Sequence, residues 1–262
     1  MPALDDGLGP GTLLWEFLGD RRFLLTLPRA VSLQMLHPSI SGAIREHSTT
    51  PKRVWEHERH TVPMLTGIAY ADRDLSSLIR YGHERVKGTD DHGRRYHALN
   101  PELFHFQHAT YVDTLFTMVE TFIRPLTPAE RERLYEECSI WYRRYGISAR
   151  AMPATWTDFQ DYFADACAGL RLGRDGEFFR EQLLRPDSWV VRWMPAGVVR
   201  ELLHPTAREL FGVQGSDRAA LAAYVGWRKV IAARGPEHRY VDVARRALFP
   251  RTQEPRTSAV PR

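Results

Sequence analysis

The sequence predicts an all-α protein, a single helical-bundle domain, and three features support this class. Apolar residues recur at spacings of three and four along several long stretches, whereas alternating β patterns are scarce. Prolines, glycines and capping residues separate these stretches. The 262 residues are 43% hydrophobic, which is enough for one sizeable core. We expect residues 1–249 to form this domain and the Pro- and Arg-rich tail 250–262 to be disordered.

Helices in the first part of the chain are predicted from their start signals. The expected caps or first residues are, in order, Thr12, Pro28, Pro38, Thr50-Pro51, and Asp72 or Asp74. The last of these helices is expected to stop at Gly88, before a polar loop.

The longest apolar-periodic stretch begins at Asn100-Pro101 and closes at Arg124-Pro125. Thr127 and Glu130 form a capping-box pattern for the next helix, which is expected to end at Gly146. Further helices are expected over 156–172, 176–185, 195–204 and 217–234.

Composition argues against several classes of function. The chain has 36 Lys and Arg against 32 Asp and Glu, and the two signs are interleaved, which is typical of a salt-bridged surface and not of a nucleic-acid-binding protein. No stretch reaches 18 uncharged apolar residues, so no membrane span is expected. Cys138 and Cys167 are too few for a disulfide framework and no signal peptide is visible, so we expect a cytoplasmic location. The oligomeric state stays open.

Histidine is unevenly distributed along the chain. Nine of the eleven histidines lie between His37 and His108. Three successive predicted helices carry a pair of polar residues at i, i+3, which places both on one face: His57 with His60, Arg80 with His83, and His105 with His108. Helix bundles build cofactor sites from facing side chains in this way, so the pattern predicts a ligand or acid–base site in the first half of the chain.

His83 has surroundings that would suit a haem. It follows Gly82, which leaves room beside the backbone, and Arg80 and Lys87 flank it at one-turn spacings, as bases that neutralise two carboxylates would. By spacing alone, the same residues also describe a half-exposed histidine near a helix end among ordinary surface bases.

Two alternatives stay open at this point. Glu102-x-x-His105 and Glu201-x-x-His204 are the pairs that a di-iron carboxylate oxygenase would use in a helical bundle, with a further carboxylate from Glu46, Glu120 or Glu137. The other alternative is a non-catalytic helical protein that binds haem or lipid.

Several short motifs occur in a fixed order over about residues 28–170. They are His37-Pro38, Arg59-His60-Thr61, Arg80-x-x-His83, Tyr96-x-Ala98-x-x-Pro101, His108-Ala109-Thr110-x-x-Asp113 and Pro125-Leu126-Thr127. In order and spacing they resemble the oxygenase family of the latex-clearing rubber oxygenases and MpaB, which includes small bacterial members of unassigned substrate.

The resemblance implies a helical bundle that encloses a pocket for one haem b, and dioxygen chemistry on a hydrophobic small molecule such as an isoprenoid or a polyene in secondary metabolism. It implies that His83 is the proximal iron ligand and that Arg80 supports it or a haem propionate. We also expect Lys87 and His108 to help to bind the cofactor. His57, His60 and Thr61 would supply the distal side. The rubber-cleaving members have R-x-x-K-T here, and this chain has His57-x-x-His60-Thr61. Whether His60 reaches the iron and whether His57 or Glu46 acts as a base stay open.

Overall fold

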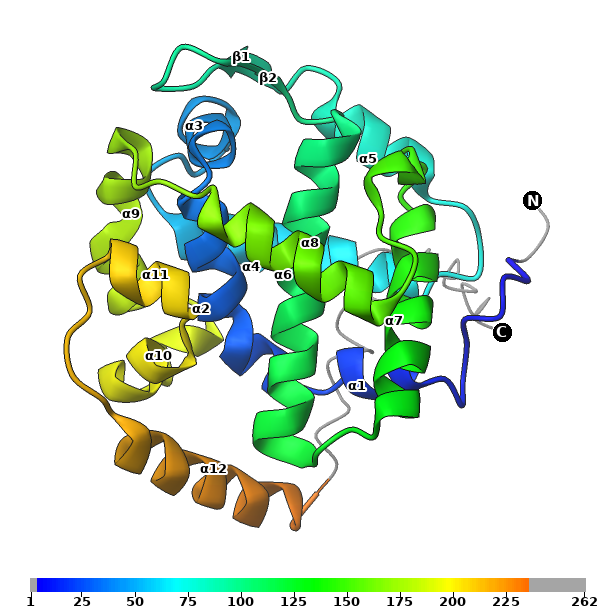
Figure 1. Cartoon of the computed structure of the whole chain (residues 1–262), viewed down its shortest axis with the longest axis vertical. Helices are drawn as coiled ribbons and strands as arrows, with labels where there is room; N and C mark the ends of the chain where they lie inside the picture. The colour runs from blue at the N-terminus through cyan, green and yellow to red at the C-terminus, as the bar shows by residue number, and fades with distance from the viewer. Residues whose placement is uncertain (1–3, 236–262) are drawn as a thin grey trace, which may run out of the picture.

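The predicted all-α class is confirmed by the computed structural model, which describes residues 4–235. Helix α6 (Pro101–Met118) runs through the middle of the molecule, and the other helices lie around it (Figure 1). The only sheet within the described range is a two-stranded hairpin. Residues 1–3 and 236–262, including the predicted tail, lie outside the described range. No helix within it is both long and apolar enough to traverse a lipid bilayer.

The elements follow the chain in a simple order. They are α1 (Leu13–Leu18), α2 (Arg22–Met35), α3 (Pro38–His47), α4 (Val54–Ala69), α5 (Ser76–His83), β1 (Lys87–Thr89), β2 (Arg95–His97), α6, a π-helical turn (Val119–Ile123), α7 (Pro128–Arg143), a 3₁₀ turn (Ala149–Ala151), α8 (Trp156–Ala168), α9 (Arg174–Leu184), a second 3₁₀ turn (Val190–Trp193), α10 (Ala196–Leu202), α11 (Pro205–Leu210) and α12 (Arg218–Ala232).

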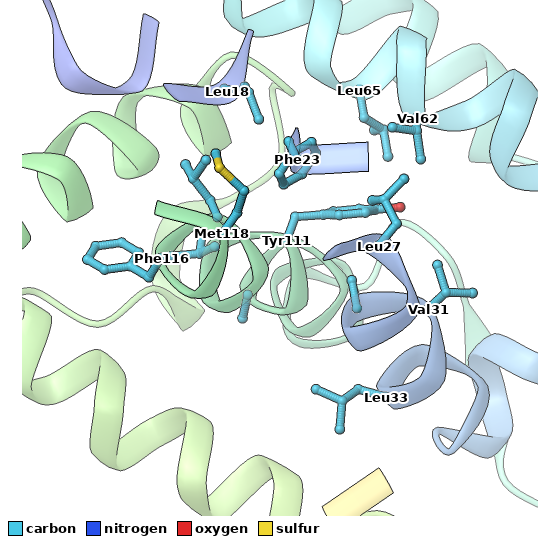
Figure 2. Close-up of a cluster of buried hydrophobic side chains, with 14 of the residues drawn as sticks. Leu18, Phe23, Leu27, Val31, Leu33, Val62, Leu65, Tyr111, Phe116 and Met118 are labelled. Carbon is cyan, nitrogen blue, oxygen red and sulfur yellow. The ribbon is translucent and has the colours of Figure 1, made fainter. Parts of the chain in front are cut away.

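The core forms around α6 and α2, which pack against each other. Both helices are buried over most of their surface, because apolar residues occur on all sides of them rather than along one stripe. Figure 2 shows Tyr111 and Met118 of α6 beside Phe23 and Leu27 of α2. This pair gives the rest of the fold, including α4 and α5, a fixed base to pack on.

Helix starts that depend on local caps lie where the sequence predicts them. The Thr12 side chain accepts a hydrogen bond from the Trp15 amide, and Asn100 accepts from the second and third amides of α6. Thr127 and Glu130 form the reciprocal capping box. Each of these contacts joins residues within one turn, so the sequence alone specifies it.

Two predicted helix starts are wrong. Pro28 lies inside α2 rather than at its start, because the chain turns earlier, at Asp20, whose carboxylate accepts from the Arg22 amide at 2.8 Å. Helix α4 starts at Val54 and not after Thr50-Pro51. Its first amide donates to the side chain of Gln182, which lies far away in sequence, at 3.0 Å.

The predicted extension of the fifth helix to Gly88 is also wrong. Helix α5 ends at His83, and Lys87 already belongs to β1, where it pairs with His97 of β2. Arg80, His83 and Lys87 therefore do not lie on one helical face. The hairpin joins two short strands, and their alternation is too brief to be detected in the sequence.

Gly146, just after α7, lies at a position where the backbone conformation and the neighbouring Ser76 both disfavour a side chain. Its φ is +69°, and a Cβ at this position would lie 2.5 Å from Cβ of Ser76. We expect Gly146→Ala to lower the free energy of unfolding by more than about 1–2 kcal/mol, the cost of the left-handed backbone alone. Gly215 has φ +77° and open space around the same position, so Gly215→Ala measures the backbone cost by itself. If urea unfolding shows that both variants lose the same free energy of unfolding, the predicted overlap between a Cβ at position 146 and Ser76 is contradicted.

Candidate functional site

A cavity of about 250 Å³, here called the His83 cavity, lies between α3, α4, α5 and α6. Most of its lining is apolar: Ile40, Ala43, Ile44, Met64, Leu65, Leu78, Ile79, Val86, Ala98 and Leu103. Its polar side chains include His57, Thr61, His83 and Gln107. Met64 and Leu78 are each 40% exposed, so the cavity reaches the surface between α4 and α5. The structure thus brings together three of the predicted site residues, His57, Thr61 and His83.

His83 lies at the end of α5 with one ring nitrogen committed to the backbone. Its Nδ1 lies 2.8 Å from the carbonyl oxygen of Ile79, and because a carbonyl only accepts, Nδ1 carries the proton. Burial lowers the pKa of His83, so the ring is neutral near pH 7. The lone pair is then on Nε2, which makes no hydrogen bond to the chain within residues 4–235. This tautomer, with Nδ1–H bound to a carbonyl, is the form in which histidine binds a metal through Nε2.

His57 and Thr61 face the same cavity from α4. The Nδ1 of His57 lies 3.0 Å from the Ser48 hydroxyl. Burial, with further contributions from His60 and His83, lowers the pKa of His57 to about 4, so His57 is also neutral at pH 7. The Thr61 hydroxyl donates to the backbone carbonyl of His57 at 3.1 Å. His57 and His83 therefore both present neutral polar groups to the cavity.

His60, Arg80 and Lys87 are exposed and do not line the His83 cavity. The Nδ1 of His60 donates to the Glu56 carbonyl oxygen at 2.7 Å, on the solvent side of α4. Glu46, a candidate base, accepts a hydrogen bond from Tyr96 at 2.9 Å and also lies outside the lining. Of the two α4 histidines, only His57 turns inward.

His108 lies deeper than the cavity, within the core. Its Nε2 donates to the Cys138 carbonyl oxygen at 3.2 Å, and burial holds its pKa well below the ordinary value. A void of about 10 Å³, here called the inner void, lies between His108 and His83 and is also lined by Tyr111 and Tyr145. His108 is thus close to His83 but separated from the main cavity.

The residues of the di-iron hypothesis do not come together. Glu102 is exposed and pairs with Arg150, whereas His105 is buried against Tyr142 and Tyr162. Glu201 pairs with Arg208 at 3.0 Å. Within residues 4–235, no group of three or more His, Cys, Asp or Glu side chains is arranged to hold a metal ion. A haem iron needs only one protein ligand, so this result does not bear on His83.

A larger cleft, of about 710 Å³, lies beside α6, α8 and α11 and contains the ion pair of Arg29 with Asp113. His204 also borders it, and its Nδ1 accepts from the Thr206 amide. None of the predicted haem-site residues lines this cleft.

Glu58 is a residue of this region that the sequence analysis did not single out. It is 1% exposed on α4 and accepts a hydrogen bond from the Tyr111 hydroxyl at 3.3 Å. Burial raises its pKa to about 7, against smaller lowering effects of Tyr111 and Thr61. The sequence does contain a signal for a buried Glu58, because this residue interrupts the apolar stripe formed by Trp55, Val62 and Leu65.

The raised pKa of Glu58 predicts a specific pH dependence of stability. The folded state holds the Glu58 proton more tightly than the unfolded state does, so this stabilisation is complete below the ordinary pKa of 4.5 and is lost as the pH rises through about 7. At about 1.4 kcal/mol per pKa unit, the loss is about 3 kcal/mol. We expect Glu58→Gln to be more stable than the wild type at pH 8, with little difference at pH 4, in urea unfolding. A constant difference across this range would contradict the assignment.

Comparison with known proteins comes from a family model. The model described as "ER-bound oxygenase mpaB/B'/Rubber oxygenase, catalytic domain" matches residues 15–233. Neither the curated proteins nor the solved structures gave a match. The family match spans every element from α2 to α12 and includes all residues of the His83 cavity. The chain therefore belongs to the mpaB/rubber oxygenase catalytic-domain family.

Proposed function

We propose that the protein is a haem b-dependent oxygenase that uses dioxygen to oxidise a hydrophobic small molecule, for which an isoprenoid or a polyene is the expected class. Membership of the family supports oxygenase activity in general. One observation carries the haem assignment: the neutral imidazole of His83 presents an Nε2 lone pair at a largely apolar cavity.

The residues around His83 fit this group. Haem requires an imidazole donor whose orientation is fixed, and the bond from Nδ1–H to the Ile79 carbonyl fixes the His83 ring. It also requires an apolar environment for a flat body, and the lining of the His83 cavity, which includes Gly82, is mostly apolar. His83 would hold the iron, while the roles predicted for Arg80, Lys87 and His108 in cofactor binding and for His60 on the distal side stay predictions.

Bound haem supplies the iron at which dioxygen is activated. The chain contributes the surroundings. The apolar wall that includes Ile44, Leu65 and Leu103 excludes bulk water and holds a hydrocarbon substrate. His57 and Thr61 are polar groups on α4 that would donate to, or accept from, a polar atom held in the cavity, and His57, with its pKa of about 4, would do so as a neutral imidazole.

The absorption spectrum of the purified, haem-supplemented protein tests this proposal. We expect an intense Soret band that shifts on reduction and on addition of carbon monoxide. Consumption of dioxygen with a reductant and a panel of isoprenoids and polyenes then separates an oxygenase from a haem or lipid carrier. A protein that takes up no haem under these conditions would contradict the proposal. The cytoplasmic location and the link to secondary metabolism stay predictions.

A further inference from the structure

Glu58 is a buried carboxyl group with no cation beside it. It is 1% exposed, and no Lys, Arg or His within residues 4–235 lowers its pKa by its charge. Its surroundings are apolar: Figure 2 shows Tyr111, which contacts it, among Leu27, Val62 and Leu65. A carboxyl group in such a place costs stability unless it stays protonated. A glutamine or an apolar residue would avoid that cost, so the carboxyl has no structural advantage here.

Glu58 is linked by two hydroxyl groups to the two spaces around His83. The Tyr111 hydroxyl donates to Oε2 of Glu58 at 3.3 Å, and Tyr111 lines the inner void together with His83. Thr61 lies one helical turn along α4 from Glu58, on the same face, where its hydroxyl group lowers the pKa of that carboxyl, and Thr61 lines the His83 cavity. Glu58 itself lines neither space, and Thr61 is the hydroxyl group between it and a ligand in the His83 cavity.

We propose that Glu58 is the proton reservoir of the His83 cavity and exchanges its proton with a cavity ligand through the hydroxyl group of Thr61. This inference rests on the proposed function. In the resting arrangement, the neutral Glu58 carboxyl donates to Oγ1 of Thr61 and its second oxygen accepts from Tyr111. Thr61 Oγ1 donates to the His57 carbonyl, and rotation of the hydroxyl redirects this proton into the cavity.

The exchange moves one proton and no electrons. The O–H bond of Glu58 breaks as a new O–H bond forms on Thr61, and the original Thr61 proton passes to a basic atom in the cavity. Glu58 is left as a carboxylate that accepts from Tyr111. The reverse sequence takes a proton from an acidic ligand and restores the neutral carboxyl group.

The other titratable groups of this cluster keep one charge state near neutral pH. Burial lowers the pKa of His57 to about 4 and holds the pKa of His108 well below its ordinary value. Burial also lowers the pKa of His83, and the pKa of Tyr145, across the inner void, lies well above its ordinary value. Burial instead raises the pKa of Glu58 to about 7, which suits a proton donor and acceptor at that pH.

A first measurement needs no haem. At pH 5 we expect an infrared C=O band from the protonated, buried carboxyl group of Glu58. The band should disappear as the pH rises, with a midpoint of about pH 7. The band should be absent in Glu58→Gln and present in Glu137→Gln, which removes another buried carboxyl group, bound to the Leu14 amide and to Arg133. A band that Glu58→Gln leaves unchanged, or its absence from the wild type, would overturn the proposal.

A second measurement uses cyanide on the haem-loaded protein. Hydrogen cyanide must lose its proton as it binds, so a carboxylate that accepts this proton speeds binding as the pH rises through about 7. We expect Glu58→Gln and Thr61→Val to slow cyanide binding about tenfold at pH 8 and to remove most of this pH dependence. Thr61→Ser keeps the hydroxyl and should resemble the wild type, as should Glu137→Gln.

Failure of the proposed function and failure of the proton reservoir give different results in these measurements. If no haem binds, the proposed function fails, and the relay that rests on it fails as well, whatever the infrared band shows about Glu58. If haem binds and Glu58→Gln takes up cyanide with the wild-type rate and pH profile, the proposed function stands and the proton reservoir is overturned. Urea unfolding would also detect a purely structural role of Glu58, because Glu58→Gln would then be less stable than the wild type at pH 8.

Discussion

Alanine in place of His83 is expected to leave the protein without bound haem. The His83 ring is held in place by the bond from Nδ1 to the Ile79 carbonyl, which leaves its Nε2 lone pair available at the cavity. Under the proposed function, removing the ring would remove the iron ligand and leave an apolar slot with little affinity for haem. The measurement is the haem content per chain, from the Soret band and from extraction of the haem. We expect the haem content to fall by more than about tenfold. Removing a residue that merely hydrogen-bonds to a metal ligand already lowers metal affinity by about 10–100-fold, and His83 is the proposed ligand itself.

The matched control is His92→Ala, because His92 is exposed in the loop between β1 and β2 and does not line the cavity. It should keep the wild-type haem content. Free imidazole added to His83→Gly provides a second check, since it should restore part of the Soret band. Full haem occupancy in His83→Ala would refute the assignment of this residue as the iron ligand.

Arg144→Ala is expected to cause a large loss of stability. The guanidinium is buried just beyond α7, and two of its nitrogens donate to the Asp6 carboxylate at 2.8 and 2.7 Å. The third donates to the carbonyl oxygens of Ala69 and Ala71 at 2.7 and 3.2 Å. Alanine would leave the Ala69 and Ala71 carbonyl oxygens without this donor and the Asp6 carboxylate without its cation, at a cost of about 3–5 kcal/mol in the free energy of unfolding. Urea unfolding measures this difference.

Arg131 offers the comparison at the surface. It pairs with Glu120 at 2.6 Å, but both side chains are more than one-third exposed. Arg131→Ala should therefore lower the free energy of unfolding by less than about 1 kcal/mol. If the two alanine variants were equally stable, the buried hydrogen bonds of Arg144 would not have the importance assigned to them.

Sequence reasoning succeeded where the determining contacts are short-range. The starts of α1, α6 and α7 depend on the side chains of Thr12, Asn100 and Thr127, each of which bonds to an amide two or three residues away. It failed at α4, whose first amide is satisfied by Gln182 of α9. It also failed at the end of α5. The apolar spacing suggested a helix that continues to Gly88, but Lys87 and Gly88 belong to β1, which pairs with β2.

The same distinction applies to the site. Spacing placed His57 and His60 on one helical face, and a helical wheel cannot say which edge of that face is turned inward. The packing of α4 against its neighbours directs His57 into the cavity and leaves His60 exposed. Glu58 escaped notice for a related reason. A glutamate is usually a surface residue, and only the tertiary structure shows that this one is enclosed by α6.

The His83 imidazole is carried by an element that is weakly anchored. Helix α5 buries only Ile79 among its eight residues, whereas α6, on the opposite wall of the cavity, is buried along most of its length. Displacing α5 outward would break few contacts, so we expect this wall to open locally while the central scaffold keeps its packing. Amide hydrogen exchange should then be fastest, among the cavity walls, at residues 76–83.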